Sequence, residues 1–505
     1  MSPTILFGDR EYSHAWMMEE VGRILAGLHG AGVKEGDTVS AMLRNSPEYV
    51  ALVLACRQAG LFLASINWHF KALEANHILV DSQARALFVD IDLVEQIRAG
   101  LPENLPIIAV PARGAGGVQR PAATLQMWAD FGAGLPPMPA RSNFAHGMIT
   151  YTSGTTGKPK GVRRIPPQQS QAAELERRML ELLDTVYGAG QNMTAYLSAP
   201  MYHSAVMMYL THCCRLGARI ALEPRFDAER ALQLIARHRV THAYLAPTMY
   251  QRLLALDPDV RARYDVSSLT HVASTGSPCP VELKKAMIDW FGPVITEAYG
   301  SSEAGYTTFI DSNDWLKHPG SAGQAMANAK IRILDEQGVQ LPPGEIGLIY
   351  VRQEALPDFT YINQPQARQN MERDGCVTLG DMGYLDADGF LFICDRKADM
   401  VISGGVNIYP AEIEGVLQTM PDVVDCAVFG VPDAEFGESV AAAVQLRPGS
   451  PVQASDIQQF LRERIANYKV PRVVEIHESL PREDTGKIFK RVLREPHWRG
   501  QQRKI

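Results

Sequence analysis

The chain has 505 residues, of which 46% are hydrophobic and 21% are charged, and its formal net charge is -7. This length allows more than one domain and a large buried core, and the composition is ordinary for a globular protein. The negative charge argues against a nucleic-acid-binding protein that relies on bulk charge. The sequence contains no run of 18 apolar residues, and residues 1–16 lack a basic segment followed by an apolar stretch, so we expect neither a membrane span nor a signal peptide.

Helical and strand-like patterns alternate through most of the chain. Residues 16–30 and 47–59 have helical spacing, and the second of these segments starts with Pro and ends before a Gly. Residues 37–43, 87–89 and 107–110 are typical of strands. This alternation predicts open α/β sheets covered by helices. Residues 112–139 are rich in Gly, Pro and Ala, and we expect a surface connection there.

The seven cysteines are scattered and include no CxxC pair, which argues against a zinc site and a disulfide framework and fits a reducing cytoplasm. Three adjacent residues of one regular element cannot all face one ion. We therefore expect His212, Cys213 and Cys214 to pack in the core.

A second pattern begins near residue 395. Residues 410–418 predict a helix, 423–430 and 440–446 predict strands, and 455–466 predict a helix with Ser455 as its N-cap. These elements indicate a small α+β domain at residues 399–505. We expect them to be preceded by an α/β N-terminal domain, residues 1–394, with a small β-rich subdomain, and the boundary between the two domains to fall at residues 395–398.

The segment from Tyr151 to Val162 reads Tyr-Thr-Ser-Gly-Thr-Thr-Gly-Lys-Pro-Lys-Gly-Val. Glycines let a backbone approach a ligand closely, and hydroxyl and ammonium groups are donors that phosphate oxygens accept. The segment is not a Walker A loop, because two residues rather than four separate Gly154 from Gly157 and Pro159 follows Lys158. The composition predicts a mobile loop that wraps the phosphates of a nucleotide.

This loop resembles the phosphate-binding signature of the adenylate-forming superfamily, which contains acyl-CoA synthetases, aryl-CoA ligases, luciferases and the adenylation domains of peptide synthetases. Three downstream segments strengthen the resemblance, which spans residues 38–490. They are Tyr-Gly-Ser-Ser-Glu at 299–303, Thr-Leu-Gly-Asp at 378–381 followed by Asp-Arg at 395–396, and Pro-Arg-Glu-Asp-Thr-Gly-Lys at 481–487. A serine-hydrolase elbow is excluded at 300–304, because Ala304 stands where that motif requires Gly.

The resemblance implies a set of residues that contact ATP or AMP. The set is Thr152, Ser153, Gly154, Thr155, Thr156, Gly157, Lys158, Lys160, Gly276, Ser277, Pro278, Tyr299, Gly300, Ser301, Ser302, Asp381 and Arg396. Tyr299 would stack on adenine, Ser302 would bind the α-phosphate, and Asp381 with Arg396 would bind the ribose. Mg²⁺ would be held by Glu303 and Thr155, since this ion takes few carboxylates together with phosphate oxygens.

The resemblance also implies catalytic, acyl and thiol sites. The implied catalytic residues are Lys487, which bridges the carboxylate and the α-phosphate, Glu303, and His203, which gates the acyl site. The implied acyl pocket consists of His203, Ser204, Met207, Thr275, Gly276 and Gly300, and the implied CoA tunnel of Ser403, Gly404, Gly405 and Tyr409. The chain departs from the family at the hinge, where Ala398 replaces the usual Lys or Asp.

The resemblance implies an AMP-forming acyl-CoA synthetase that uses ATP, Mg²⁺ and coenzyme A as co-substrate. Segments 201–209 and 246–249 of the presumed acyl pocket are rich in Met, Val and Tyr and contain no Lys, Arg, Asp or Glu. Such a surface favours a medium- to long-chain fatty acid or another bulky hydrophobic acid, with an aryl acid as the alternative.

Three other functions stay open at this point. A stand-alone adenylation enzyme would load a separate carrier protein, and a luciferase-type oxygenase would share the first half-reaction. A nucleotide-binding regulator without turnover is disfavoured, because a pure binder does not need Lys487 beside Glu303 and Asp381. We expect a cytoplasmic protein, and the sequence leaves a homodimer open.

Overall fold

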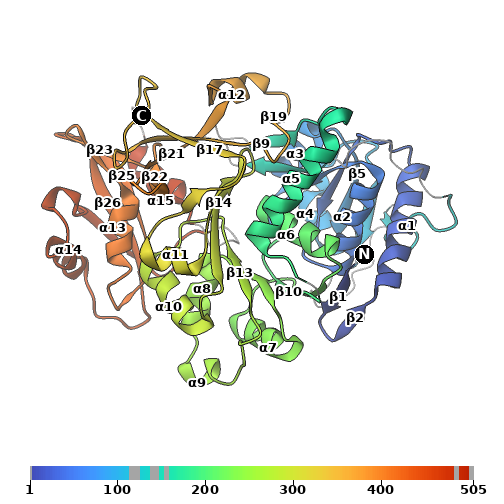
Figure 1. The fold of residues 1–505 in the computed structure, drawn as a ribbon, viewed down its shortest axis with the longest axis horizontal. Coiled ribbons are helices and arrows are strands. Elements are labelled where there is room, and N and C mark those ends of the chain that lie inside the picture. Colours follow the sequence, from blue (N-terminus) through green and yellow to red (C-terminus); the bar gives the residue numbers. More distant parts are fainter. Residues whose placement is uncertain are drawn as a thin grey trace.

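The computed structural model of the protein describes residues 3–112, 125–136, 147–152, 159–190, 192–482 and 488–499. The described strands form three sheets, with eight, fourteen and five strands. Figure 1 shows them along the long axis of the molecule, with the blue N-terminal elements at one end and the orange and red C-terminal elements at the other. The predicted fold class, a large N-terminal α/β domain with a smaller C-terminal domain, is confirmed.

The eight-stranded sheet has the order β19-β9-β8-β4-β3-β5-β6-β7 and is parallel except that β9 runs antiparallel to both of its neighbours, β8 and β19. Its strands are β3 (Thr38–Met42), β4 (Phe62–Ser65), β5 (Ala84–Asp90), β6 (Ile107–Val110), β7 (Gln126–Met127), β8 (Met148–Thr152), β9 (Lys160–Arg164) and β19 (Phe359–Tyr361). Its helices are α1 (His14–Gly30), α2 (Pro47–Ala59), α3 (Ala72–Asp81) and α4 (Val94–Ile97). At the antiparallel end of this sheet, β8 and β9 contain the two ends of segment 151–162, which we call the phosphate-loop motif.

Helix α2 has the predicted bounds, because its start and its stop are both encoded locally. The Ser46 side chain accepts a hydrogen bond from the Tyr49 amide, and Pro47 occupies the first turn, where a missing N–H has no cost. Gly60 ends the helix in the left-handed conformation at φ 66°.

The fourteen-stranded sheet has a parallel centre, β11-β10-β12-β13-β14, and antiparallel strands beyond β14. Its strands are β1 (Thr4–Phe7), β2 (Arg10–Tyr12), β10 (Thr194–Leu197), β11 (Arg219–Leu222), β12 (His242–Tyr244), β13 (His271–Ser274), β14 (Ile295–Ser301), β15 (Gly305–Ile310), β16 (Gly323–Ala325), β17 (Ala329–Leu334), β18 (Gly347–Gln353), β20 (Glu372–Arg373), β21 (Cys376–Leu385) and β22 (Phe390–Arg396). Its helices are α5 (Gln169–Tyr187), α6 (Ser204–Arg215), α7 (Ala228–His238), α8 (Pro247–Leu254), α9 (Pro258–Arg261), α10 (Val281–Phe291), α11 (Ser312–Lys317) and α12 (Pro365–Asn370).

The five-stranded sheet belongs to the small C-terminal domain, which has its own apolar core. Its strands are β23 (Val401–Ser403), β24 (Val406–Ile408), β25 (Val423–Asp433), β26 (Gly437–Leu446) and β27 (Val473–His477), and its helices are α13 (Pro410–Leu417), α14 (Ala454–Arg462) and α15 (Lys490–Arg494). The prediction for α14 was wrong at both ends. The N-cap is Gln453, whose backbone amide donates to the Asp456 carboxylate at 2.8 Å, so Ser455 lies inside the helix.

In the described part of the predicted surface connection at residues 112–139, residues 129–130 and 133–136 are exposed, but the segment also contains a strand and buried side chains. Residues 126–127 form β7, and Trp128 and Phe131 are buried. Both rings pack edge-on against Phe88, and Phe131 occupies the space that a Cβ on Gly27 of α1 would need, 2.5 Å from a ring carbon. Residues 113–124 and 137–139 of that prediction lie outside the described residues.

His212, Cys213 and Cys214 are buried at α6, so their predicted place in the core is confirmed. Within the described residues, no helix is long and apolar enough to cross a membrane.

Candidate active site

The motif residues gather where strands of the large domain end. Thr152 is the last residue of β8 and Lys160 the first of β9, so the phosphate-loop motif joins these two antiparallel strands. The predicted contacts at Ser153, Gly154, Thr155, Thr156, Gly157 and Lys158 lie outside the described residues, as does Lys487. Gly276, Ser277 and Pro278 follow the carboxyl end of β13, where parallel α/β sheets bind ligands.

The motif at residues 299–303, which we call the second motif, spans the end of β14 and the tight connection to β15. A Cβ on Gly300 would lie 2.3 Å from the carbonyl oxygen of Gly305, so this close approach requires a glycine. The Ser301 hydroxyl accepts a hydrogen bond from the Ala304 amide at 2.9 Å. The connection therefore holds Ser302 and Glu303 in a fixed turn at the end of β14.

Glu303 is a buried carboxylate with two hydroxyl donors. The hydroxyls of Thr152, on β8, and Tyr361, on β19, both donate to its Oε1, at 3.1 and 3.0 Å. Within the described chain, Oε2 accepts no hydrogen bond. One uncommitted carboxylate oxygen beside the phosphate-loop motif fits a hard cation such as Mg²⁺, which takes oxygen ligands.

Asp381 joins two other predicted site residues. Tyr299 donates its hydroxyl to Asp381 Oδ2 at 2.7 Å, and the Arg396 guanidinium lies 3.3 Å from Oδ1. Asp381 on β21 pairs directly with Arg396 on β22, which explains how residues fifteen apart in the chain come together. Burial, together with the Asp381 charge, raises the pKa of Tyr299 well above its usual value, so its hydroxyl stays a donor.

The predicted acyl residues surround the start of α6. His203 is the N-cap residue of α6, and its ring lies 4.4 Å from that of Tyr202. The hydroxyl groups of Ser204 and Ser302 are 2.9 Å apart, which links the acyl set to the second motif. Met207 is buried one turn further along α6.

Of the other three acyl residues, Gly300 lies on β14, and Thr275 and Gly276 follow β13. The Thr275 hydroxyl donates to the carbonyl of Ala298 on β14 at 2.9 Å. Gly276 is exposed and adopts φ 96°, a conformation that glycine favours.

Four buried tyrosines, which we call the tyrosine cluster, lie against the acyl set: Tyr187 (α5), Tyr209 (α6), Tyr244 (β12) and Tyr306 (β15). The Tyr187 and Tyr306 hydroxyls are 2.6 Å apart, and Tyr187 donates to the Ala205 carbonyl at 2.7 Å. The rings of Tyr187 and Tyr209 are 5.3 Å apart, and those of Tyr209 and Tyr244 are 5.9 Å apart. The Tyr244 hydroxyl lies 3.8 Å from the Cβ position of Gly276.

The predicted CoA residues form a hairpin in the small domain. Ser403 ends β23, and Gly404 and Gly405 make the turn to β24 at φ 57° and 83°, with the Gly404 amide donating to Phe436. Tyr409 is the N-cap residue of α13. Gly404 and Gly405 are exposed, and within the described part of the chain this turn is bonded to its own domain.

At the predicted hinge, the Ala398 carbonyl accepts a hydrogen bond from Arg494 of α15 at 3.2 Å.

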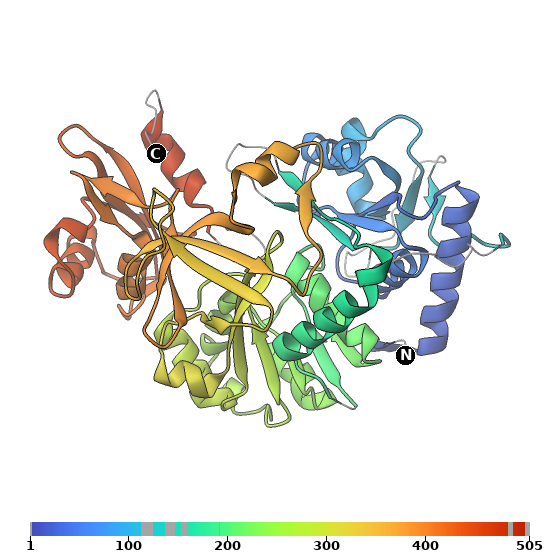
Figure 2. The ribbon, with the colours of Figure 1, turned by 45° about the horizontal axis from the view of Figure 1, so that its top comes forward.

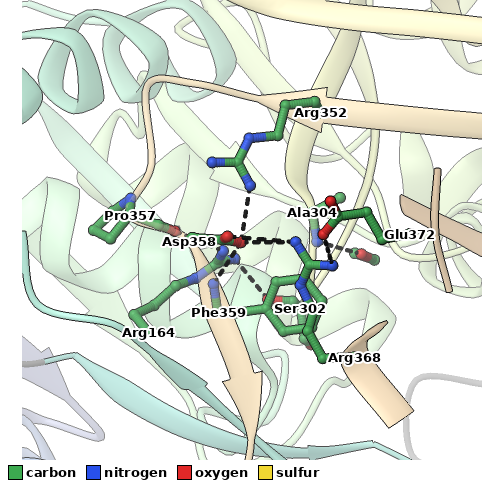
Figure 3. A network of polar contacts seen from close by, with 10 residues as sticks. Arg164, Ser302, Ala304, Arg352, Pro357, Asp358, Phe359, Arg368 and Glu372 are labelled. Carbon is green, nitrogen blue, oxygen red and sulfur yellow. Dashed lines mark hydrogen bonds and ion pairs between the residues drawn. The ribbon is translucent and has the colours of Figure 1, made fainter. Parts of the chain in front are cut away.

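Sequence analysis missed the tyrosine cluster, Tyr361 and Arg164. Arg164 donates to the Ser302 carbonyl at 2.7 Å and to the Pro357 carbonyl at 3.1 Å (Figure 3). The sequence shows only that Arg164 is the second of two arginines at the end of a strand, and the position of β9 between β8 and β19 is needed to show where its side chain goes. A cavity of about 220 Å³ beside this network is lined by other charged residues, among them Arg352 and Arg368, and by none of the predicted site residues.

Comparisons with known proteins fit this geometry. Residues 2–356 match the family described as AMP-binding enzyme, and residues 412–487 match the AMP-binding enzyme C-terminal domain. The chain is 33% identical over 500 residues to a feruloyl-CoA synthase of an Amycolatopsis species, covering 98% of this chain and 96% of that protein. It is 30% identical over 514 residues to a fatty acid–[acyl-carrier-protein] ligase of Streptomyces coeruleorubidus, covering 100% and 95%.

Solved structures agree with these matches. The o-succinylbenzoate CoA synthetase of Bacillus subtilis, in complex with its acyl-adenylate intermediate, superposes with a TM-score of 0.81 at 26% identity and covers 97% of this chain and 95% of that one. The chain therefore belongs to the AMP-binding enzyme family and is an AMP-forming acid–CoA ligase.

Proposed function

We propose that this ligase converts a bulky hydrophobic carboxylic acid, ATP and CoA into acyl-CoA, AMP and pyrophosphate. The supporting observation is the position of Glu303, whose carboxylate is bonded to the last residue of β8, where the phosphate-loop motif begins. The Tyr299–Asp381–Arg396 group provides the acceptor for ribose hydroxyls, and Ser302 lies beside Ser204 of the acyl set.

In the first half-reaction, the carboxylate oxygen of the acid attacks the α-phosphorus of ATP, and pyrophosphate leaves. The protein contributes mainly placement and charge stabilisation. Ser302 and the phosphate-loop motif hold the phosphates, Asp381 holds the ribose, and Lys487 stabilises the charge that develops between carboxylate and α-phosphate. Glu303 and Thr155 would hold Mg²⁺, which neutralises phosphate charge when bound.

In the second half-reaction, the thiolate of CoA attacks the carbonyl carbon of the acyl-adenylate, and AMP leaves. The exposed Gly404–Gly405 turn offers a surface without side chains for the thiol arm to pass. For this step the small domain must turn about the segment at Ala398, whose alanine side chain does not restrict backbone rotation.

The tyrosine cluster favours an aromatic acid over a long fatty acid. Its four rings come from elements that also carry, or directly contact, the acyl residues, and none is more than 4% exposed. The four rings pack beside the acyl set, and aromatic rings pair edge-on or offset with other rings. A flat, compact acid fits such a wall, whereas a long alkyl chain would require several tyrosines to move.

Pyrophosphate release across a panel of acids, with and without CoA, tests the proposal. The panel should contain cinnamic-type and arylacetic acids and fatty acids of eight to eighteen carbons, and acyl-CoA should be followed by mass. Acid-dependent pyrophosphate release together with acyl-CoA formation supports the ligase. Transfer only to an added carrier protein would indicate an acyl-carrier-protein ligase, and release with long fatty acids alone would refute the aromatic preference.

A further inference from the structure

Arg164 directs its guanidinium at backbone carbonyls rather than at a carboxylate. It lies at the end of β9 and donates to Ser302 and Pro357, and among the described residues it forms no ion pair. Desolvation lowers the pKa of this guanidinium to about 10, so the side chain is still charged at neutral pH. A desolvated cation is costly unless it makes strong hydrogen bonds, and a charged donor forms stronger bonds than a neutral one.

The peptide that Arg164 contacts is the one that enters Glu303. Because the Ser302 carbonyl and the Glu303 amide belong to one planar unit, the 2.7 Å bond fixes the backbone orientation from which the Glu303 side chain projects. Ser302 also carries the hydroxyl that faces Ser204. One guanidinium therefore fixes both the predicted nucleotide-binding residue Ser302 and the predicted Mg²⁺ ligand Glu303.

The strands around Arg164 hold the same glutamate from its other end. Strands β8, β9 and β19 are neighbours in the eight-stranded sheet, and Arg164 pairs in register with Phe359. Thr152 of β8 and Tyr361 of β19 bond the Glu303 carboxylate, while Arg164 of β9 bonds its backbone. Three adjacent strands of one sheet thus hold a residue that belongs to another sheet.

The second carbonyl bound by Arg164 is itself part of a braced bend. Asp358 follows Pro357 and accepts hydrogen bonds from Arg352 at 2.8 Å and from Arg368 at 3.2 Å. Figure 3 shows the Arg164 guanidinium between this bend and the Ser302 segment. Because Arg352 and Arg368 hold this bend, the bend fixes the position of Arg164. Arg164 in turn fixes the position of Glu303.

We propose that Arg164 is a positioning residue that sets Glu303 against the phosphate-loop motif, and that the enzyme needs it for magnesium-bound triphosphate but not for nucleoside monophosphate. The inference rests on the proposed function, in which Glu303 holds Mg²⁺ on the ATP phosphates. Adenosine and its α-phosphate would be held by Asp381, Tyr299 and Ser302, so AMP does not require Glu303.

The test compares Arg164→Gln and Arg164→Lys with Arg163→Gln in the full-length enzyme. Arg163 is the matched control, because it is also partly buried on β9 but stacks on Phe62 at 4.0 Å, away from Ser302. Calorimetry should measure the Kd of AMP and of ATP with and without Mg²⁺, and steady-state assays should separate the KM for MgATP from the KM for the acid.

We expect Arg164→Gln to raise the Kd and KM for MgATP about tenfold, the scale on which loss of a group that orients a metal ligand weakens metal binding. AMP affinity and the KM for the acid should change less than about twofold, within the range of a neutral substitution. Arg164→Lys should recover part of the loss, because one ammonium can keep the Ser302 bond, and Arg163→Gln should match the wild type.

Two results would overturn the inference. One is an unchanged MgATP affinity in folded Arg164 variants, and the other is an equal loss of AMP and MgATP affinity, which would indicate a general structural role. Thermal unfolding shows whether each variant is folded. If Arg164→Gln does not fold, the binding measurements on Arg164→Lys decide the test. Failure of the wild-type enzyme to bind MgATP would instead refute the proposed function.

Discussion

Glu303 depends on residues that are remote in the chain. Thr152 lies 151 positions before it and Tyr361 lies 58 positions after it. The motif at 299–303 made Glu303 recognisable from the sequence. Tyr361 and Arg164 were not recognisable, because their importance comes only from the pairing of β8, β9 and β19.

Lys487 carries a prediction at this scale. Lys487→Ala should slow acyl-adenylate formation about 10²–10³-fold, the effect of removing one donor to a developing charge. Thiolysis of supplied acyl-AMP by CoA should be nearly unchanged, because the charge between carboxylate and α-phosphate no longer exists in that step. Single-turnover assays of both half-reactions measure this, with exposed Lys317→Ala as the control. Equal damage to both half-reactions would contradict the assigned role.

At the scale of elements, the sequence predicted the bounds of a helix correctly where capping residues mark both of its ends. Helix α2 has its predicted bounds because Ser46 and Pro47 at its start and Gly60 at its end are its immediate neighbours or members in the chain. The predictions failed where another part of the chain decides. Trp128 and Phe131 are buried by Phe88 and α1, which the Gly- and Pro-rich sequence around them does not reveal.

One buried ion pair joins a helix to the strand that carries the second motif. Lys284 of α10 has no exposed side-chain surface, bonds Glu297 of β14 at 2.7 Å, and lies 4.7 Å from the ring centre of Trp315. The Glu297 side chain is 13% exposed. The pair therefore fixes α10 beneath β14.

Lys284→Met should lower the free energy of unfolding by about 3–5 kcal/mol, because it leaves the Glu297 charge buried without a partner. The double variant Lys284→Met/Glu297→Gln should recover much of this loss, since no unpaired charge remains. Urea denaturation measures both, and the exposed neighbour Lys285→Met is the control. A single variant as stable as the control would contradict this account.

For the whole molecule, the predicted α/β class and the small C-terminal domain are confirmed, and the way the sheets meet was not predicted. Figure 2 shows the teal and orange strands of the eight-stranded sheet beside the yellow strands of the fourteen-stranded one. The fourteen-stranded sheet joins strands from both ends of the large domain, from β1 to β22. Hydrophobic periodicity indicates which face of a strand is buried but not which strand becomes its neighbour.

Stability in acid is a property of the whole fold and depends on three histidines at one place. His242 stacks with His271 at 5.8 Å, and His212 Nε2 donates to the Gly188 carbonyl at 2.6 Å in the same region. Burial lowers the pKa of His242 to about 4, and the charges of His271 and His212 add to this effect.

In the unfolded chain His242 takes up a proton near pH 6.5, whereas in the folded chain it does so only near pH 4. The unfolded chain therefore binds more protons than the folded chain between pH 6.5 and 4. The free energy of unfolding should therefore fall as the pH falls through this window, by roughly 3 kcal/mol from His242. Urea denaturation between pH 7 and 4 should show a shallower slope for His242→Gln, while exposed His29→Gln should keep the wild-type slope. Equal slopes in all three proteins would contradict the assignment.

The place of β19 has a consequence for biosynthesis. Arg164 of β9 is synthesised about 195 residues before Phe359, its pairing partner on β19. Until then β9 is an unpaired sheet edge, a surface on which other chains can add strands. A nascent or truncated polypeptide that stops short of residue 359 would thus expose the edge of β9 to aggregation. This edge stays uncovered until β19 has been synthesised.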